Sequence, residues 1–545
     1  DILRLSTALD RVTVSFVCDL AVTGNIDSYT VKAGETVYLP ENPYTGIPEG
    51  FAFEGWTDGK KLYKEYEALA AGHADLVFKA VWRTDAAVAF SEETVRYVDG
   101  YATLTFDKPI GKECLTAANF GTGLSYVGYG ENTNTVRVYI DYKSVKLGKS
   151  FTVSVKNLSD YAHGYIYNCT GQRTYTLEST PTYTPGGNHI PNGSFDLPYA
   201  TDYFDGQITP RDGDGYMLFV PRSEVGWNYV RWNVNFESGK RYYLEYDAKA
   251  GKDADGNALA AATVNCAANV GGDRMLTGTI VSSSAWSHVE YLIPAELNMT
   301  EWFGIYSNPE GGKSISYFLD NVSLKEAFTA AFTAPDGETA TETYTLPAGK
   351  ERVMPTLADG YVWSDGTAVY LPGESYVTPA KAVFYTAVPV SPVLSEKLSM
   401  RTNGQTGIRF KASVSARTRF YCDEYGLLVT RSTLLSAANL ADEAFTREAA
   451  VNMVVGKAYQ KGGIDYVSGM TADGDYEFTS AIVGIPFTKE ACTEKIVVRP
   501  YVLIGQTAFY GNVRKASLAD AANAVKNHPD YTGNDYVEKV LELCK

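Results

Sequence analysis

The stretches "IPNGSFD", residues 190–196, and "YFLDNVSL", residues 317–324, bracket the most informative segment of the sequence. Each places one carboxylate beside a short apolar run. In a closed β-sandwich the first and last strands commonly lie side by side, so we expect Asp196 and Asp320 to meet at one end of the fold. Two carboxylates repel each other unless a cation lies between them, and Ca²⁺ prefers oxygen ligands. The pair therefore predicts a structural Ca²⁺ site, completed by carbonyls of the turn at 238–240; the alternative is that Asp320 only caps a turn.

The stretch "WNYVRWNVNF", residues 227–236, alternates between apolar and polar side chains, as a half-buried strand does. One face carries Val230, Trp232, Val234 and Phe236 and should belong to the core. The other face combines aromatic rings, a cation and amides. A sugar needs such a face, because its C–H surface stacks on aromatic rings while its hydroxyls pair with polar groups.

Later strands add an acid and two aromatic residues to the predicted sugar-binding surface. The ligand-binding residues that we predict are Trp227, Tyr229, Arg231, Asn233, Glu245, Trp302 and Tyr306. For each residue two other interpretations remain open. It can lie on a solvated outer face, or its aromatic ring can pack against a loop.

The order of motifs over residues 185–327 resembles that of carbohydrate-binding modules of families four, nine and twenty-two. The resemblance rests on Asn-Gly-x-Phe-acid at 192–196, Ser-Gly-Lys-x-Tyr at 238–242 and Leu-Asp-Asn-Val-Ser-Leu at 319–324. It implies a β-jelly roll, a structural Ca²⁺ near Asp196 and Asp320, and binding of a polysaccharide. A β-linked plant glycan such as xylan or β-glucan is favoured by this resemblance, with a host mucin glycan as the alternative.

Two other segments resemble each other and a known repeat. "GFAFEGWTDG" at 50–59 and the strand ending at Trp82 are similar to the internalin-type B-repeat, a β-grasp-like module of bacterial surface proteins. Residues 1–84 are assigned to this repeat. A degenerate second copy is predicted over 328–392, where Trp363 stands in the place of Trp56. Such repeats usually act as spacers.

The remaining segments complete a mostly β chain, which is predicted to be a string of small β-domains. Residues 85–180 resemble bacterial Ig-like sandwiches. Residues 396–545 are similar to an uncharacterised domain at the end of many large bacterial surface proteins. For this last part we expect a β-sandwich with two helices, the first capped by Ser517 and the second over 535–544.

Composition excludes several classes of function. The net charge of -16 argues against nucleic acid and anionic membranes as partners. The sequence has no apolar run of about 18 residues, so no membrane insertion is expected. The five histidines lie in five different segments, the cysteines lack metal-ligand spacing, and common catalytic motifs are missing.

Taken together, the modules predict a non-catalytic, extracellular protein of the bacterial cell surface, either a mature form or a segment of a longer chain. Its jelly roll would bind a polysaccharide while the other modules act as spacers. Other surface proteins are further candidate partners. Two alternatives stay open. The chain can be a structural or adhesive subunit that binds protein or mucin, or the non-catalytic part of a larger glycoside hydrolase.

Overall fold

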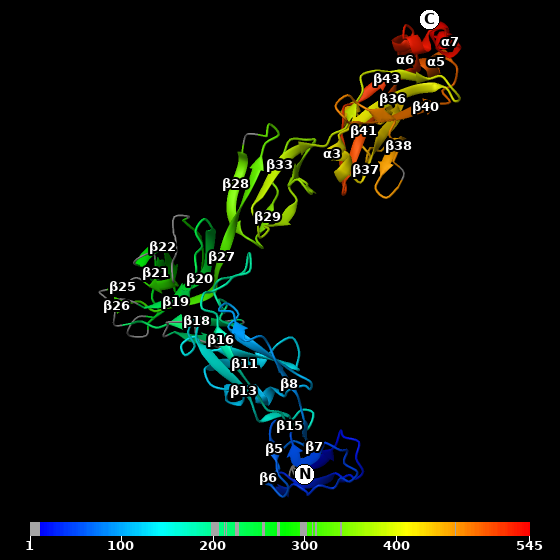
Figure 1. Cartoon of the computed structure of the whole chain (residues 1–545). Coiled ribbons are helices and arrows are strands. Elements are labelled where there is room, and N and C mark those ends of the chain that lie inside the picture. The colour runs from blue at the N-terminus through cyan, green and yellow to red at the C-terminus, as the bar shows by residue number, and fades with distance from the viewer. Residues whose placement is uncertain are drawn as a thin grey trace, which may run out of the picture. The chain divides into compact units, whose positions relative to one another are not determined.

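The computed structural model is mostly β, as the sequence predicts, and consists of many small sheets (Figure 1). The structure describes residues 11–197, 206–211, 213, 215–223, 228–252, 257–269, 273–294, 302–307, 309–310, 313–337, 340–463 and 465–545. The chain divides into two units, residues 1–327 and 328–545. This division falls at one of the predicted boundaries; the other boundaries stay predictions. Every helix in the described part is too short or too polar to cross a lipid bilayer.

The first module of unit 1 is a small sheet closed by aromatic side chains. Parallel pairing joins its first and last strands, and Trp56 and Trp82 are both buried in its core. The strands are β1 (Arg11–Val17), β2 (Tyr29–Lys32), β3 (Thr36–Tyr38), β4 (Ala52–Thr57), β5 (Leu62–Tyr63), β6 (Ala68–Ala70) and β7 (Leu76–Asp85).

The second module is a sandwich with its own core around Leu104, Val138 and Tyr175. Its elements are β8 (Val88–Phe90), β9 (Thr94–Val95), β10 (Tyr101–Phe106), α2 (Ala117–Phe120), β11 (Leu124–Tyr129), β12 (Thr135–Ile140), β13 (Ser150–Val155), β14 (Leu158–Asp160), β15 (Tyr165–Asn168) and β16 (Gly171–Leu177). The hairpin β14–β15 differs from expectation, because β15 pairs in parallel with β7 and so extends the sheet of the first module.

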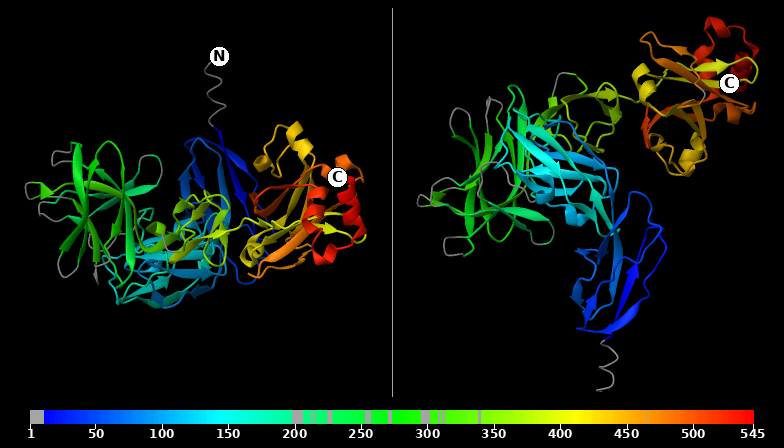
Figure 2. Two further views of the ribbon diagram at one scale, coloured as in Figure 1. Left: turned by 90° about the horizontal axis from the view of Figure 1, so that it is seen from above. Right: turned by 60° about the horizontal axis from the view of Figure 1, so that its bottom comes forward.

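The third module, green in Figure 2, is a sandwich of two antiparallel sheets. One layer has the order β19-β24-β21-β22, and the other contains β17, β18, β27, β20 and β23. The strands are β17 (Gln207–Pro210), β18 (Tyr216–Val220), β19 (Tyr229–Asn233), β20 (Arg241–Ala250), β21 (Ala261–Asn269), β22 (Asp273–Ser282), β23 (Ser287–Ile293), β24 (Trp302–Ser307) and β27 (Tyr317–Thr333), with the small pair β25 (Pro309–Glu310) and β26 (Lys313–Ser314).

The core of this sandwich confirms the predicted alternation. Val230, Trp232, Val234 and Phe236 are all buried in one cluster. They face Tyr242, Leu244 and Tyr246 of β20, which alternate with outward-facing polar residues. Burial of this apolar face drives the two layers together.

Unit 2 begins with a module that repeats local features of the first one. Trp363 is fully buried and donates its indole N–H to the carbonyl of Pro355 at 2.8 Å, as Trp56 does to Pro40 at 2.8 Å. Each tryptophan is followed by an aspartate-led turn bonded to a tyrosine hydroxyl. The elements are the last residues of β27, β28 (Ala340–Pro347), β29 (Glu351–Val353), β30 (Tyr361–Ser364), β31 (Val369–Tyr370), β32 (Ser375–Val377) and β33 (Val383–Pro389).

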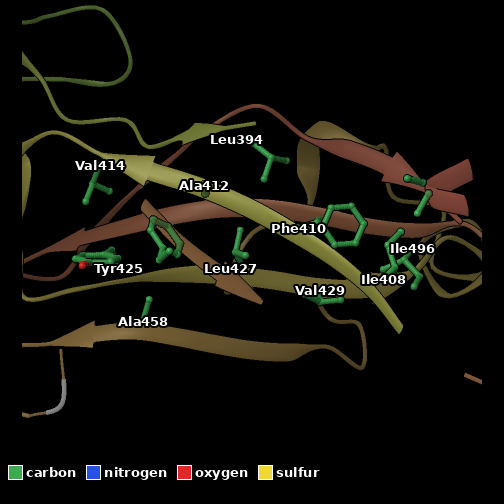
Figure 3. Close-up of a cluster of buried hydrophobic side chains, with 14 of the residues drawn as sticks. Leu394, Ile408, Phe410, Ala412, Val414, Tyr425, Leu427, Val429, Ala458 and Ile496 are labelled. Atoms are coloured by element: carbon green, nitrogen blue, oxygen red, sulfur yellow. The ribbon is translucent and has the colours of Figure 1, made fainter. Parts of the chain in front are cut away.

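The C-terminal domain is a sandwich of two five-stranded sheets, with α5 (Lys489–Thr493), α6 (Leu518–Val525) and α7 (Asp535–Leu543) at one end (Figure 1). Figure 3 shows its core, where side chains such as Phe410, Leu427 and Tyr425 fill the space between strands. The first sheet contains β34 (Val393–Leu394), β35 (Ser399–Arg401), β36 (Gly407–Val414), β39 (Gly469–Met470) and β40 (Tyr476–Val483); the second contains β37 (Glu424–Arg431), β38 (Val454–Gln460), β41 (Ile496–Ile504), β42 (Thr507–Tyr510) and β43 (Arg514–Ala516).

Both predicted C-terminal helices are present. Helix α6 (Leu518–Val525) begins after Ser517, whose side chain forms a capping box with Asp520, and α7 is Asp535–Leu543. The sequence did not predict the short helices α3 (Ala416–Tyr421), α4 (Ser432–Ala437) and α5 (Lys489–Thr493).

Candidate functional site

The two ends of the jelly roll lie side by side, as their matched sequences predict. Residues 188 and 325 form an isolated bridge, and the N–H of Val322 donates to the carbonyl of Gly193 at 2.8 Å. A Cβ atom at Gly193 would lie 1.9 Å from the Val322 carbonyl oxygen, so only glycine fits. The stretch 190–196 forms turns rather than a strand.

The two predicted calcium ligands differ in their burial. Asp320 is buried and forms an ion pair with Arg211, and it also accepts a hydrogen bond from the N–H of Asn321 at 2.7 Å. Burial raises the pKa of Asp320 against the opposing effect of these two partners. Asp196 is exposed. Because the guanidinium already supplies the positive charge at Asp320, a Ca²⁺ ion there would have to displace it; the calcium site stays a prediction.

The predicted sugar-binding residues fall on the two opposite sheets of the jelly roll. Tyr229, Arg231 and Asn233 lie on β19, and Trp302 and Tyr306 lie on the neighbouring strand β24. Glu245 lies on β20, which belongs to the other sheet. Trp227 lies outside the described residues. The structure therefore brings the strand residues of β19 and β24 together but separates Glu245 from them.

The β19–β24 face is built from cross-strand pairs. Arg231 stands opposite Gly304, and Asn233 stands opposite Trp302. The missing side chain at Gly304 leaves room for the indole, since a Cβ atom there would lie 3.0 Å from the Trp302 ring. Trp302 is only 4% exposed, and the Arg231 guanidinium lies 4.9 Å from its ring centroid. Trp302 is thus a buried platform that positions Arg231.

Two further residues complete this outer face. Tyr306 is half-buried and stands opposite Asn265 on β21, and Asn265 stands opposite Gly278 on β22. Asn265 is only 1% exposed although it is polar and on the outer side of the sheet. Sequence reasoning missed Asn265, because the strand that carries it lacks strict alternation. We call Arg231, Asn233, Asn265, Trp302 and Tyr306 the aromatic face.

The other sheet carries a cluster of acids around one histidine. Nδ1 of His288 lies 2.8 Å from Asp247, and its Nε2 lies 3.7 Å from both Glu245 and Glu290. The candidate ligand atoms of Glu245, His288 and Glu290 lie within 4.8 Å of one another. We call these four residues the histidine cluster. Sequence spacing could not reveal it, because β20 and β23 come together only through their pairing.

The second module contacts the end of β19. The N–H of Asn233 donates to the hydroxyl of Tyr97 at 3.0 Å, and the N–H of Asn235 donates to that of Tyr183 at 3.2 Å. Tyr183 in turn stacks on His189, with ring centroids 3.4 Å apart. His189 is 3% exposed, and burial lowers its pKa to about 3. These contacts tie the linker to the jelly roll.

Comparisons with known proteins add the following. No family model and no curated protein match the chain. A solved structure described as "CBM4 structure and function" is 15% identical, with 25% of this chain and 99% of that one covered and a TM-score of 0.19. The CBM22-1 xylan-binding domain from Paenibacillus barcinonensis Xyn10C is 12% identical, with 25% and 91% covered and a TM-score of 0.20. The C-terminal CBM6 of LamC from Zobellia galactanivorans is 17% identical, with 22% and 89% covered and a TM-score of 0.15. With such TM-scores these likenesses carry no argument about the site.

Proposed function

We propose that the jelly roll binds a neutral polysaccharide on the aromatic face and that the protein is a non-catalytic, extracellular glycan-binding protein. The observation that carries this proposal is the placement of Arg231 over Trp302, with Tyr306 on the same face. A guanidinium held in place by a ring can donate fixed hydrogen bonds to sugar hydroxyls. Tyr306 offers a ring for the C–H surface of a sugar.

Under this proposal the predicted sugar-binding residues have different roles. Arg231, Asn233 and Tyr306 would contact the glycan, whereas Trp302 would act through Arg231. The roles expected of Trp227 and of the Tyr229 side chain stay predictions, because both lie outside what the structure describes. Glu245 would take no part, because it lies on the opposite sheet. A β-linked plant glycan such as xylan or β-glucan stays the favoured ligand, by the sequence resemblance alone. The remaining modules would serve as spacers at the bacterial surface.

The test compares the two sheets of the jelly roll. Affinity electrophoresis of the full chain through xylan, β-glucan, mannan and mucin would be run for the parent, Arg231→Ala, Tyr306→Ala and Glu245→Gln. We expect retardation on at least one neutral polymer, its loss in the first two variants, and its retention in Glu245→Gln. Loss only in Glu245→Gln would move the site to the histidine cluster. Retardation on mucin alone would support the adhesive alternative.

A structural role of the jelly roll is the second candidate, favoured by the contacts of Tyr97 and Tyr183 with the end of β19. In that case the face would serve the junction between modules instead of a ligand. Absence of binding to every polymer, with lowered stability in Tyr306→Ala, would support this second function.

A further inference from the structure

The C-terminal domain contains a groove of about 1560 Å³. Its floor is the outer side of β36 and β40, and its walls come from residues 395–403, from the end of α6 with residues 528–531, and from Tyr466 and Ser468. We call it the basic groove. Its volume exceeds the roughly 300–1,000 Å³ of most small-molecule pockets, so it suits a segment of a polymer.

The basic groove has a positive charge although the chain as a whole is at -16. Three carboxylates line it, those of Glu396, Glu477 and Asp530. Five fixed cations outnumber them: Lys397, Arg401, Arg409, Lys411 and Arg514. Because the rest of the chain is negatively charged, an anionic ligand is attracted to this groove more than to the surrounding surface.

Among the described residues, the five cations differ in their partners: Arg401 and Arg514 donate to backbone carbonyls, and the side chains of two others have no partner at all. Lys411 is paired with Glu477, 3.0 Å away. In the part of the chain that the structure describes, the side chains of Lys397 and Arg409 form neither an ion pair nor a hydrogen bond. Arg409 is nevertheless half-buried on the floor. A partly desolvated guanidinium without a carboxylate gains most from a ligand that brings one.

The strand register leaves space above Arg409. Its neighbour across β40 is Ala481, and its neighbour across β35 is Ser399, so short side chains flank the guanidinium on both sides. At the far wall, burial lowers the pKa of Arg514, against the opposing charge of Glu396. The groove thus holds cations that are partly shielded from water and open on the ligand side.

The rest of the lining fits a sugar chain better than a protein. Protein partners usually insert large apolar anchors into well-packed pockets. Here the lining is rich in hydroxyl and amide groups, including those of Ser399, Thr402, Asn403, Ser468 and Thr479. Two tyrosine rings line it. Tyr531 is half-buried and its hydroxyl donates to the Met400 carbonyl, whereas Tyr466 is 53% exposed and available for stacking on a sugar.

We propose that the basic groove binds an acidic polysaccharide, with Arg409 and Lys397 holding its anionic groups and Tyr466 stacking on a sugar ring. The chemistry required is a negatively charged sugar chain. The charge can come from the carboxylate of a uronic acid or from a sulfate ester. This site is independent of the aromatic face, which is proposed for a neutral glycan.

The test uses calorimetry with the full chain and three probes: polygalacturonate, chondroitin sulfate and neutral xylan. We expect at least one acidic probe to bind, with an affinity that falls as salt is added, and to bind Arg409→Gln about tenfold more weakly. Lys539→Gln removes the same charge from an exposed site outside the lining and should leave the affinity unchanged. Binding of polygalacturonate assigns the anion to carboxylate. Chondroitin sulfate carries carboxylates as well as sulfates, so unsulfated chondroitin serves as its control, and binding of the sulfated form alone assigns the anion to sulfate.

A second variant separates binding from folding. Glu477→Gln removes an acid from the groove and frees Lys411. Binding of the acidic probe should therefore become tighter. Damage to the fold would weaken binding instead, so the two effects can be distinguished. Arg231→Ala should leave acidic binding intact, and Arg409→Gln should leave neutral binding intact. The proposal is overturned if neither acidic probe binds, if Arg409→Gln binds like the parent, or if single-stranded DNA binds as tightly as the acidic glycans.

Discussion

The guanidinium of Arg231 lies 4.9 Å from the centre of the Trp302 ring, and the two residues sit diagonally on neighbouring strands. Cation–π contacts of partly desolvated groups are worth about 1–2 kcal/mol. The contact fixes a charged donor group at a defined place on the outer side of the sheet. The first prediction concerns the shape of that group.

Arg231→Lys should weaken neutral glycan binding about five- to tenfold and lower the free energy of unfolding by about 1 kcal/mol or less. Lysine keeps the charge but loses the planar group that stacks on the indole and donates in a fork. Titration calorimetry and differential scanning calorimetry measure the two quantities. Equal binding by the lysine variant would mean that charge alone matters at this position.

Gly304→Ala should lower both binding and stability. The new methyl group would lie 3.0 Å from the Trp302 ring and 3.1 Å from the Val230 carbonyl oxygen, so the indole must move. Overpacking of this kind costs about 1–3 kcal/mol. Chemical denaturation followed by tryptophan fluorescence would check the cost. Full stability together with full binding would show that the ring is not held as described.

Arg211→Ala should destabilise the jelly roll by about 3–5 kcal/mol, because it leaves the buried carboxylate of Asp320 without its cation. Added Ca²⁺ should then raise the midpoint of the variant more than that of the parent, since the freed carboxylate regains a positive partner. Thermal scans with Ca²⁺ and with chelator test both statements. A parent that loses stability in chelator would instead place the ion beside the intact Arg211 pair.

His189 should make the jelly roll less stable in acid. Its pKa is about 3 in the folded protein and about 6.5 in an unfolded chain, so the unfolded state binds the extra proton between these values. Stability is therefore fully present above pH 6.5 and falls by up to about 1.4 kcal/mol per pH unit as the pH drops toward 3. Hydrogen exchange of β20 and β27 amides reports this slope. The variant His189→Phe keeps a ring that can stack on Tyr183 but cannot take up a proton. Its stability should therefore depend less on pH.

Glu424→Gln should destabilise the C-terminal domain by about 3–5 kcal/mol. Glu424 is 4% exposed and accepts from the Tyr501 hydroxyl at 2.5 Å, while Arg447 and Lys457 each approach it to 3.0 Å. The amide would leave both cations without an anion. Urea denaturation gives the change, with Glu538→Gln on the exposed side of α7 as the control. A loss below 1 kcal/mol would contradict the role of this network.

Sequence periodicity predicted the core of the jelly roll because alternation reports which side chains share a face. Val230 and Trp232 were placed correctly in this way, as was the pairing of the module's two ends. Alternation cannot tell which sheet a strand joins. Glu245 and Arg231 both point outward, but from opposite layers, so they do not share a site.

The burial of Trp302 cannot be predicted from the sequence of its own strand alone. Gly304 gives the ring space and Arg231 covers it, and the second contact depends on the register between β19 and β24. The histidine cluster and the basic groove were missed for the same reason. Their residues come from segments far apart in the chain, and the local sequence around each residue contains no motif that would indicate a site.

The contacts at the end of β19 have a consequence for the behaviour of the protein at high concentration. β19 is the edge strand of its sheet, and a bare edge can pair with a strand of another molecule and start aggregation. Two N–H groups at this end of the strand already donate to the hydroxyls of Tyr97 and Tyr183. By occupying these groups, tyrosines outside the sandwich make this end of the edge unavailable to a strand of another molecule.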